Sequence, residues 1–368
     1  ALRSMTPSAL EHRITTLTSA AIKAKALELG FDLCGVSAAV AHPKLARLAT
    51  WIAEGRAGEM HYLADSLDER LDPRVFLPTA RSVISLAVVY NSSATPAPTA
   101  ASEEDEQGRA SIARYARGDD YHDVLRARMR ALVQWMADTH GPGLEALTCV
   151  DDGPVQERVF AEQAGLGWIG KHTCVINPKL GSWLFIAEIV TNAELECDRP
   201  AVDQCGTCTR CLDACPTGAI VEPYLVDATR CLSYLTIEQR GEIDPSLRPE
   251  IREQIYGCDI CQDVCPWNRR AATSDDEAWR PRDGLLSPAL IDLCAMTDEA
   301  WRLLLKGSAM RRAGLRRRRH RLRMDPLALH LPDAGQERPP PDHGGQRDHR
   351  ERGGENAGGD HAQARRAS

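Results

Sequence analysis

The sequence predicts an α/β domain over residues 1–197, a cysteine-rich module over residues 198–270 and a helical segment over residues 271–324. Two observations predict this arrangement. Helical and buried-strand patterns alternate through the first half of the chain. Eight of the thirteen cysteines then fall between Cys205 and Cys265. At 368 residues the chain is long enough for such a division, because a domain usually holds about 100–200 residues.

The elements of the first domain follow from hydrophobic periodicity. Apolar residues recur at steps of three or four over residues 8–29, which predicts an amphipathic helix ending near Gly30. Ser82 to Tyr90 is a nearly continuous apolar run, typical of a strand buried on both faces. Further helices are expected at about 43–54, 121–139 and 155–164, and further strands at 31–36, 144–150 and 182–191.

The composition changes after the cysteine-rich module. A helical pattern covers residues 287–306, and Arg311 to Arg323 then holds eight arginines. Residues 325–368 are rich in Gly, Pro, Arg, His and Asp, and they contain no aromatic Phe, Tyr or Trp. We expect 325–368 to be a solvated, disordered tail. The alternative is that the arginine run binds phosphate groups without sequence specificity.

Charge and hydropathy narrow the possible functions. The net charge is −7, so the chain as a whole is not a basic nucleic-acid binder, and any RNA contact needs a local patch. Hydrophobic residues make up 43% and charged residues 26%, as in ordinary soluble proteins. No apolar run is long enough to span a bilayer, and the first residues show no secretion signal. A cytoplasmic protein without a membrane partner is therefore expected.

The cysteines form two motifs with the spacing of iron–sulfur ligands. The first reads Cys205-x2-Cys208-x2-Cys211-x3-Cys215-Pro216, and the second reads Cys258-x2-Cys261-x3-Cys265-Pro266, with Cys231 upstream. Thiolates two residues apart on a tight turn can grip the corners of one cubane. In two-cluster ferredoxins the fourth cysteine, which precedes Pro, ligates the other cluster.

This rule assigns the eight cysteines to two 4Fe–4S clusters. The first set is Cys205, Cys208, Cys211 and Cys265. The second set is Cys215, Cys231, Cys258 and Cys261, in which Cys231 replaces the missing nearby cysteine of the second motif. Adjacent clusters that share ligand loops would lie close enough for electron transfer.

Two structural zinc sites are the alternative reading of these motifs, since zinc also uses paired cysteines. The x2-x2 spacing and the two Cys-Pro endings favour iron–sulfur over zinc. The other five cysteines lie singly and are expected to be small buried hydrophobes rather than ligands: Cys34, Cys149, Cys174, Cys197 and Cys294.

Gly165, Gly167 and Gly170 match the pattern G-x-G-x-x-G of dinucleotide sites. The segment before them reads as a helix and the segment after them does not start one. A dinucleotide site needs the reverse order, with the strand first, so we reject a nicotinamide cofactor here. We expect these glycines to let the backbone approach a bulky ligand.

Three carboxylates near the predicted elements are candidate proton donors. Asp151 follows the apolar strand 147–150, at the end where α/β sheets usually place their chemistry. The alternative is an N-cap or turn aspartate for the helix at 155–164. Asp119 and Asp120 could equally be N-caps of the helix that begins near Tyr121.

Over about residues 10–315 the chain resembles the epoxyqueuosine reductases. The resemblance is carried by the segment Val150 to Val155 and by Ala161 to Thr173, which includes the three glycines. It is also carried by Gly118-Asp119-Asp120-Tyr121-His122, Gly181-Ser182-Trp183-Leu184-Phe185 and Tyr256-Gly257-Cys258-Asp259-Ile260-Cys261-Gln262.

The resemblance implies an enzyme that reduces epoxyqueuosine to queuosine at the tRNA wobble position, the last step of queuosine biosynthesis. It implies a cobalamin-binding α/β domain similar to nitroreductases and corrinoid reductive dehalogenases, with cobalamin between that domain and the ferredoxin-like module. The pattern D-x-H-x-x-G is missing, so the cofactor is expected to be held without a protein histidine on cobalt. We expect a monomer that acts on the anticodon stem-loop and takes electrons from a separate donor.

The resemblance also implies roles for individual residues. The family's proton donor corresponds to Asp151, which would also border the cobalamin. Positions similar to corrinoid contacts are Arg70, Val175, Ser233 and Asp259, a position similar to a tRNA contact is Arg158, and a second pocket carboxylate corresponds to Asp120.

The implied chemistry agrees with the residues. An epoxide accepts two electrons, and its oxygen leaves more readily once it is protonated. The hypothesis is that reduced cobalt attacks or reduces the epoxide carbon while Asp151 protonates the oxygen, its pKa raised by burial beside the corrin. Two alternatives are a corrinoid reductive dehalogenase and a plain electron carrier, which would need only residues 198–270.

Overall fold

An antiparallel sheet forms the centre of the protein. The structure is a computed structural model that describes residues 17–93 and 108–313. The sheet has the order β1-β2-β7-β4 and consists of β1 (Leu33–Ala38), β2 (Ser82–Val89), β7 (Leu184–Thr191) and β4 (Ala146–Cys149). Every neighbouring pair is antiparallel. All eight residues of β2 are buried, which confirms the prediction of a strand covered on both faces.

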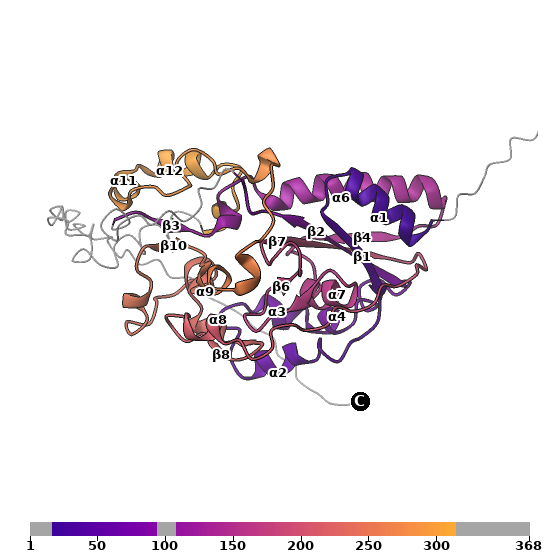
Figure 1. Ribbon diagram of the computed structural model, residues 1–368, viewed down its shortest axis with the longest axis horizontal. Coiled ribbons are helices and arrows are strands. Elements are labelled where there is room, and N and C mark those ends of the chain that lie inside the picture. Colours follow the sequence, from indigo (N-terminus) through magenta and orange to yellow (C-terminus); the bar gives the residue numbers. More distant parts are fainter. Residues whose placement is uncertain (1–16, 94–107, 314–368) are drawn as a thin grey trace, which may run out of the picture. The chain divides into compact units, whose positions relative to one another are not determined.

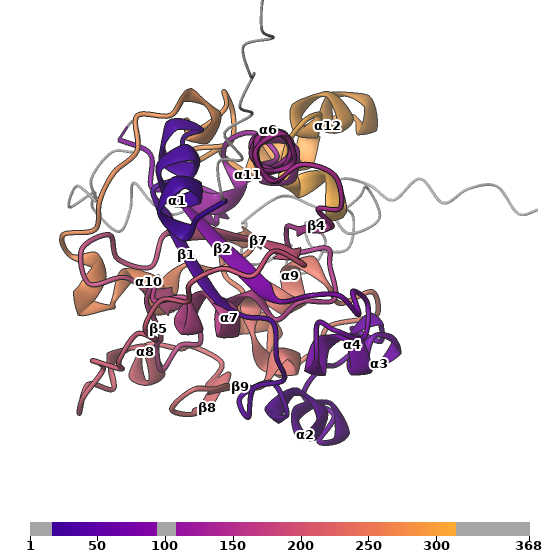
Figure 2. The same ribbon diagram turned by 90° about the vertical axis from the view of Figure 1, so that its right-hand side faces the viewer.

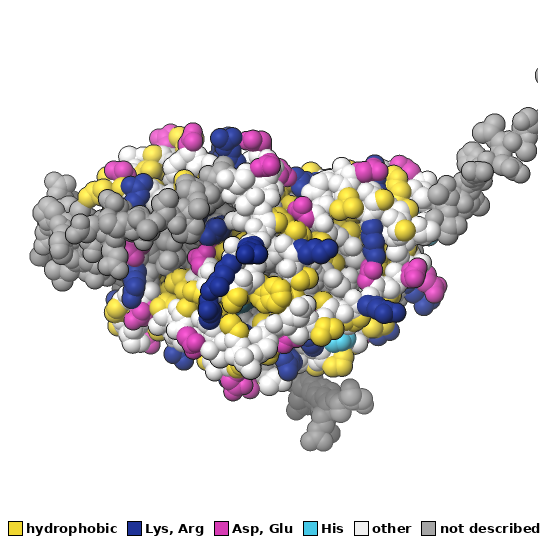
Figure 3. Space-filling view, viewed as in Figure 1, with side chains coloured by type: hydrophobic (Ala, Val, Ile, Leu, Met, Phe, Trp, Pro, Cys, Tyr) yellow, Lys and Arg dark blue, Asp and Glu magenta, His cyan; other side chains and the backbone are white. Residues whose placement is uncertain are grey.

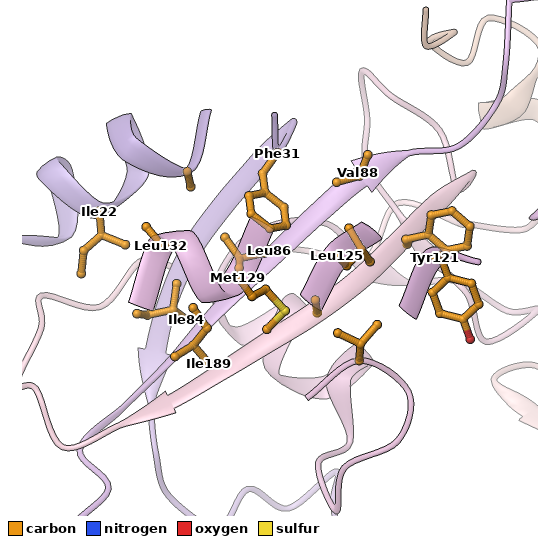
Figure 4. Close-up of a cluster of buried hydrophobic side chains, with 14 of the residues drawn as sticks. Ile22, Phe31, Ile84, Leu86, Val88, Tyr121, Leu125, Met129, Leu132 and Ile189 are labelled. Carbon is orange, nitrogen blue, oxygen red and sulfur yellow. The ribbon is translucent and has the colours of Figure 1, made fainter. Parts of the chain in front are cut away.

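Helices cover both faces of this sheet (Figures 1 and 2). α1 (Ser19–Glu28) and α6 (Tyr121–His140) lie on one face, and α7 (Glu157–Gln163) lies on the other. The core between the sheet and the first two helices is apolar, as Figure 4 shows; it includes Ile22, Phe31, Ile84, Leu86, Val88, Leu125, Met129, Leu132 and Ile189. None of the described helices is long and apolar enough to span a membrane.

Local signals fix the ends of the two long helices. Thr18 caps α1 by accepting a hydrogen bond from the backbone N–H of Ala21 at 3.2 Å, and the left-handed Gly30 follows the helix. Asp120 caps α6, and Gly141 ends it with a φ of 86°. The predicted helix over 121–139 is therefore confirmed. Of the helix expected over 8–29, residues 8–16 lie outside the described part of the chain.

The cysteine-rich module consists of short elements joined by tight turns. They are α8 (Arg210–Asp213), β8 (Ile220–Glu222), β9 (Leu225–Val226), α9 (Leu232–Ile237), β10 (Gln254–Tyr256) and α10 (Ile260–Asp263). β10 pairs in parallel with β3 (Ser111–Ile112), so a segment from the first half of the chain joins this module.

Further short elements complete the described chain. The helices are α2 (Arg47–Ala53), α3 (Tyr62–Asp65), α4 (Leu67–Leu71), α11 (Leu290–Ala295) and α12 (Asp298–Leu305), and the strands are β5 (Trp168–Ile169) and β6 (Val175–Ile176). The 3-10 turns are η1 (Arg114–Ala116), η2 (Ala228–Arg230), η3 (Arg248–Glu250), η4 (Pro266–Asn268), η5 (Glu277–Trp279) and η6 (Ala309–Ala313).

The helical pattern predicted over 287–306 corresponds to two helices. The structure has α11 and α12 there, separated at Met296 and Thr297. Thr297 accepts a hydrogen bond from the backbone N–H of Ala300 at 3.2 Å and so caps a new helix. The expected tail over 325–368 and most of the arginine run lie outside the described residues.

The glycines of the G-x-G-x-x-G segment accommodate the chain itself, which corrects the expectation of a bulky ligand. A Cβ at Gly165 would lie 2.7 Å from the backbone oxygen of Arg199, and one at Gly167 would lie 2.3 Å from the backbone oxygen of Ile176. A helix precedes them and the β5–β6 hairpin follows, so the rejection of a dinucleotide site agrees with the structure.

A buried polar network joins the sheet to the cysteine-rich module. Gln262 donates through Nε2 to the backbone oxygen of Ser182 at 2.9 Å and to its Oγ at 3.0 Å. Asn268 donates through Nδ2 to the same Oγ at 2.8 Å, and its Oδ1 accepts the Ser182 backbone N–H at 2.7 Å. Because these polar groups satisfy one another across the contact, they help to fix how the two parts meet.

Candidate active site

A cavity of about 1070 Å³ lies between the sheet domain and the cysteine-rich module. Its first wall comes from α2, from α4 and from the segment 151–159 at the start of α7. Its second wall comes from residues 215–234 and from residues 258–262 on either side of the start of α10. This volume includes the space that a cluster bound at the wall cysteines would fill. It is large for a small-molecule site, for which about 300–1,000 Å³ is usual.

All four cysteines of the second set line this cavity. Burial raises the pKa of the Cys258 thiol to about 12, and the nearby Cys231 and Cys215 add to the rise. Burial also raises the pKa of Cys261 well above its usual value, with Cys174, Cys258 and Cys231 contributing. The structure therefore brings together the four cysteines that the spacing rule grouped.

The first set lies outside the cavity lining. Burial raises the pKa of Cys211 to about 11, and the proximity of Cys265 and Cys205 adds to the rise. Cys265 and Cys205 share an apolar cluster with Trp168. The buried Lys171 donates through Nζ to the backbone oxygens of Gly206 at 2.7 Å and Cys208 at 2.9 Å. This cation thus holds the loop that carries Cys205 and Cys208. Within the described ranges no three His, Cys, Asp or Glu side chains are spaced to hold a single metal ion.

Asp151 lies at the cavity wall in the turn between β4 and α7, with a left-handed φ of 57°. Its side chain is exposed, and the hydroxyl of Tyr121 donates to its Oδ2 at 2.7 Å. It does not cap α7, whose N-cap is Gln156. Asp152 makes the turn instead, because its Oδ1 accepts the Val150 backbone N–H at 2.9 Å. The carboxylate of Asp151 is thereby left facing the cavity.

A second carboxylate lies beside Asp151. The Oε1 of Glu157 accepts the Asp151 backbone N–H at 3.1 Å, and both residues line the cavity. Burial, together with the neighbouring Asp151, raises the pKa of Glu157 to about 7. Near neutral pH this carboxyl can therefore either hold or release a proton.

Four of the other residues singled out from the sequence line the same cavity, namely Arg70, Arg158, Ser233 and Asp259. The backbone N–H of Arg114 donates to Oδ2 of Asp259 at 2.8 Å. Burial raises the pKa of Asp259 to about 6 in spite of this bond and of the nearby arginines. Arg158 is exposed at the cavity, and its Nη1 lies 3.3 Å from the backbone oxygen of Thr173.

Two of the singled-out residues do not join the cavity. Asp120 caps α6, and its Oδ1 lies 2.7 Å from Nδ1 of His122, so the N-cap alternative is the one the structure bears out. Hydrogen bonding to His122 lowers the pKa of Asp120. The side chain of Val175 packs in an apolar cluster with Ala161 and Leu166, and Val175 is not among the residues that line the cavity.

Comparison with known proteins gives the family. Residues 204–268 match the family described as 4Fe-4S double cluster binding domain, and residues 70–152 match Epoxyqueuosine reductase QueG, DUF1730. An epoxyqueuosine reductase of Synechocystis sp. is 46% identical over 268 residues, covering 72% of this chain and 89% of that protein. One of Cellulophaga algicola is 40% identical over 300 residues, covering 80% and 95%. The chain belongs to the epoxyqueuosine reductase family.

Solved structures of epoxyqueuosine reductases have the same fold. One, in complex with an epoxyqueuosine-modified tRNA-Tyr stem loop, is 30% identical with a TM-score of 0.76, covering 84% of this chain and 81% of that chain. Another, from Bacillus subtilis, is 29% identical with a TM-score of 0.75 over the same shares, and its catalytic aspartate loop is swung out of the active site. The predicted fold class is confirmed. As an epoxyqueuosine reductase the chain is an iron–sulfur oxidoreductase, and neither a plain electron carrier nor a dehalogenase.

Several residues of this epoxyqueuosine reductase site were not singled out from the sequence, although Lys171 and His172 lie in a segment that carries the resemblance. Glu157 is one of many acidic residues in a first helical turn, and only its burial beside Asp151 distinguishes it. Lys171 is separated by more than thirty positions from the loop that it holds. His172 is a lone histidine, yet its buried Nε2 has no hydrogen-bond partner and its ring borders the cavity. Tyr121 could have been found, because the resemblance includes it.

Proposed function

We propose that the chain reduces epoxyqueuosine in the anticodon stem-loop of tRNA to queuosine. Electrons would pass from two 4Fe–4S clusters to cobalamin, and Asp151 would donate a proton. One observation carries this proposal: Asp151 and all four cysteines of the second set line the same cavity. A proton donor and an electron-delivering site therefore open onto one space.

The donor groups fit two iron–sulfur clusters with crossed ligation. Cys265, which ends the second motif, lies beside Cys211 and Cys205 of the first. Cys215, which ends the first motif, lies beside Cys258 and Cys231. This exchange of the last cysteine is the ligation pattern of two-cluster ferredoxins.

Backbone and indole N–H groups near the cysteine sulfurs give further support. The Ala219 backbone N–H donates to Sγ of Cys215 at 3.2 Å. The buried Nε1 of Trp168 has no hydrogen-bond partner at normal hydrogen-bond distance and angle. It is close enough to Cys205 to lower the pKa of that thiol, whereas burial raises it. N–H groups of this kind stabilise the charge of a reduced cluster.

The cavity wall fits a large cofactor with polar side groups. His172 offers a buried Nε2 without a partner, and Nδ1 of the same ring accepts the Cys174 backbone N–H at 3.2 Å, so the neutral ring carries its proton on Nε2. We propose that Arg70, Ser233 and Asp259 hold cobalamin there together with His172. Cobalamin bound there would supply a metal centre able to store two electrons.

Tyr121 prepares Asp151 for proton donation. Burial raises the pKa of Tyr121 well above its usual value, so the hydroxyl stays protonated and donates to Oδ2 of Asp151. Oδ1 is then the oxygen that carries the transferable proton toward the epoxide oxygen. In the Bacillus subtilis relative the catalytic aspartate loop is swung out of the active site. We propose that the turn bearing Asp151 moves in the same way, closing over the bound substrate.

Binding of tRNA would use the exposed side of the cavity. The relative crystallised with a modified stem loop supports this substrate. Arg158 is exposed there and can reach a phosphate group. Figure 3 also shows basic side chains beside hydrophobic ones near the middle of one face, a combination suited to phosphates and stacked bases. We propose that a single copy of the chain binds the stem-loop and receives electrons from a separate donor.

The experiment is an anaerobic mass-spectrometric assay of an anticodon stem-loop carrying epoxyqueuosine. The protein is supplied with a strong reductant, with or without cobalamin. We expect the base to lose one oxygen only when cobalamin is present. Lack of conversion by protein with both clusters intact would contradict the proposed substrate.

Asp151→Asn tests the proton donor in the same assay. We expect turnover to fall about 10²–10⁴-fold, while cobalamin and both clusters remain bound, because general acid catalysis contributes this much. Asp152→Asn is the matched control, since its side chain can still accept the Val150 N–H and should leave turnover unchanged. Full turnover by Asp151→Asn would remove Asp151 from the mechanism.

A further inference from the structure

Reduction of an epoxide to an alkene and water consumes two electrons and two protons. The Asp151 carboxyl can hold only one of these protons. Asp151 must therefore be reprotonated once in every turnover, or a second acid must donate directly. This inference rests on the proposed function, since it concerns the proton balance of that reaction.

Glu157 occupies the position that a reprotonating group needs. Its Oε1 accepts the Asp151 backbone N–H at 3.1 Å, and the Asp151 carboxylate is close enough to contribute to the raised pKa of Glu157. Asp151 is exposed, whereas Glu157 is partly buried behind it in the first turn of α7. Both residues line the cavity, so both border the space in which the substrate would bind.

The charged and titratable groups around Glu157 come from four elements. Asp151 faces it from the turn, and Arg158 follows it on α7. Glu188 on β7 and Cys149 on β4 interact with it from the sheet. Of these four neighbours only Arg158 is a cation, and it is solvent-exposed. Burial and Asp151 both raise the pKa of Glu157, which reaches about 7. A proton is therefore available on this carboxyl at neutral pH.

We propose that Glu157 is the group that returns a proton to Asp151 during each turnover. In this step the O–H bond of the Glu157 carboxyl breaks and an O–H bond to the Asp151 carboxylate forms. Glu157 then takes a proton from water in the cavity, and no electron moves. Glu157 acts through Asp151, so it is a positioning residue for the proton and not itself the catalytic residue.

Glu188 is the other acidic group near this pair, and it does not serve the same purpose. It is fully buried in β7, where Ser85 donates through Oγ to its Oε2 at 2.7 Å and its Oε1 has no partner. Burial raises the pKa of Glu188 well above its usual value. Its proton therefore stays in place at working pH, which makes Glu188→Gln a matched control.

The test is the pH profile of kcat for Glu157→Gln. Glutamine can still accept the Asp151 N–H, so the turn is retained while the acid is lost. In the unaltered protein kcat should fall as pH rises through about 7, because the protonated form of Glu157 is the active one. In the variant kcat should be roughly 10²-fold lower without this limb, and KM for the stem-loop should not change. Protonated imidazole should partly restore its kcat by protonating Asp151 directly.

Two further variants separate a proton role from a structural one. Glu157→Asp keeps a carboxyl and should regain part of the lost kcat together with a pH-dependent limb. Glu188→Gln should keep the profile of the unaltered protein. An unchanged profile in Glu157→Gln, or an equal loss in Glu157→Asp and Glu157→Gln without imidazole rescue, would overturn the inference. Absence of turnover in the unaltered protein would instead count against the proposed function.

Discussion

The two sets of cysteines have different surroundings although their sequence motifs are similar. The second set, Cys215, Cys231, Cys258 and Cys261, lines the cavity beside Asp151. The first set, Cys205, Cys208, Cys211 and Cys265, does not line the cavity. Its Cys205 and Cys265 pack with Trp168 and Trp267, whose rings lie 4.9 Å apart. At the first set, Lys171 donates hydrogen bonds to the backbone oxygens of Gly206 and Cys208, in the loop that carries Cys205 and Cys208.

We propose that this difference sets the direction of electron flow. A cluster held by the second set borders the cavity and can pass electrons directly to a group bound there. A cluster held by the first set does not border the cavity, so its electrons would pass through the cluster of the second set. The cysteine motifs alone are nearly symmetric and give no such order. The order comes from the sheet domain, which covers one set with Trp168 and leaves the other facing Asp151.

The largest effect should distinguish serine variants of the two sets. Cys258→Ser should abolish turnover with every electron donor, because it removes the cluster at the cavity. Cys208→Ser should leave part of the turnover driven by a small reductant that enters the cavity, while turnover with a protein donor is lost. Each variant should retain about half of the iron if the two clusters bind independently. Equal loss with both donors in Cys208→Ser would contradict the proposed order.

A smaller effect is expected on the reduction potential of the first cluster. Lys171→Gln removes a buried cation beside the loop of Cys205 and Cys208, so the more negative reduced cluster loses stabilisation and its potential should fall. A change of on the order of 1 kcal/mol corresponds to roughly 40 mV for a one-electron couple. An electron paramagnetic resonance titration of both clusters measures this. The exposed Lys179→Gln is the control, and an equal shift of the second cluster would contradict the assignment.

The smallest effect concerns the contact between the two parts of the molecule. Ser182→Ala removes the Oγ that accepts hydrogen bonds from Gln262 and Asn268, and these buried donors lose a partner. We expect the free energy of unfolding to fall by about 1–3 kcal/mol, measured by urea unfolding of protein without cofactors. Ser93→Ala, at an exposed hydrogen bond, should change it by less than about 0.5 kcal/mol. Similar values for both variants would mean that the network does not stabilise this contact.

The sequence was sufficient where the signal is local. The apolar run of β2 and the periodicity of α6 depend on neighbouring residues, and both agree with the structure. The cysteine spacing is also local, and residues 204–268 match a 4Fe-4S double cluster binding domain. Asp151 was placed correctly after its strand, but for a reason that belongs to parallel sheets, whereas β4 is an edge strand of an antiparallel one.

The sequence was insufficient where distant segments decide the outcome. Glu157 owes its raised pKa to burial and to Asp151, and Lys171 finds its partners in another module. The resemblance predicts that Asp120 is a pocket carboxylate, but in the structure Asp120 is the N-cap of α6. The helical pattern over 287–306 did not show where one helix ends and the next begins, a boundary at which Thr297 caps α12.

The contact between Ser182 and Asn268 has a consequence for the order of events during synthesis on the ribosome. The two residues are 86 positions apart. At about 5–20 residues per second, translation reaches Asn268 roughly 4 to 17 seconds after Ser182. Throughout this interval the sheet can form while Ser182 still lacks its partners. The second wall of the cavity is then added to the sheet, so the nascent chain can acquire its complete binding site only after Asn268 has been synthesised.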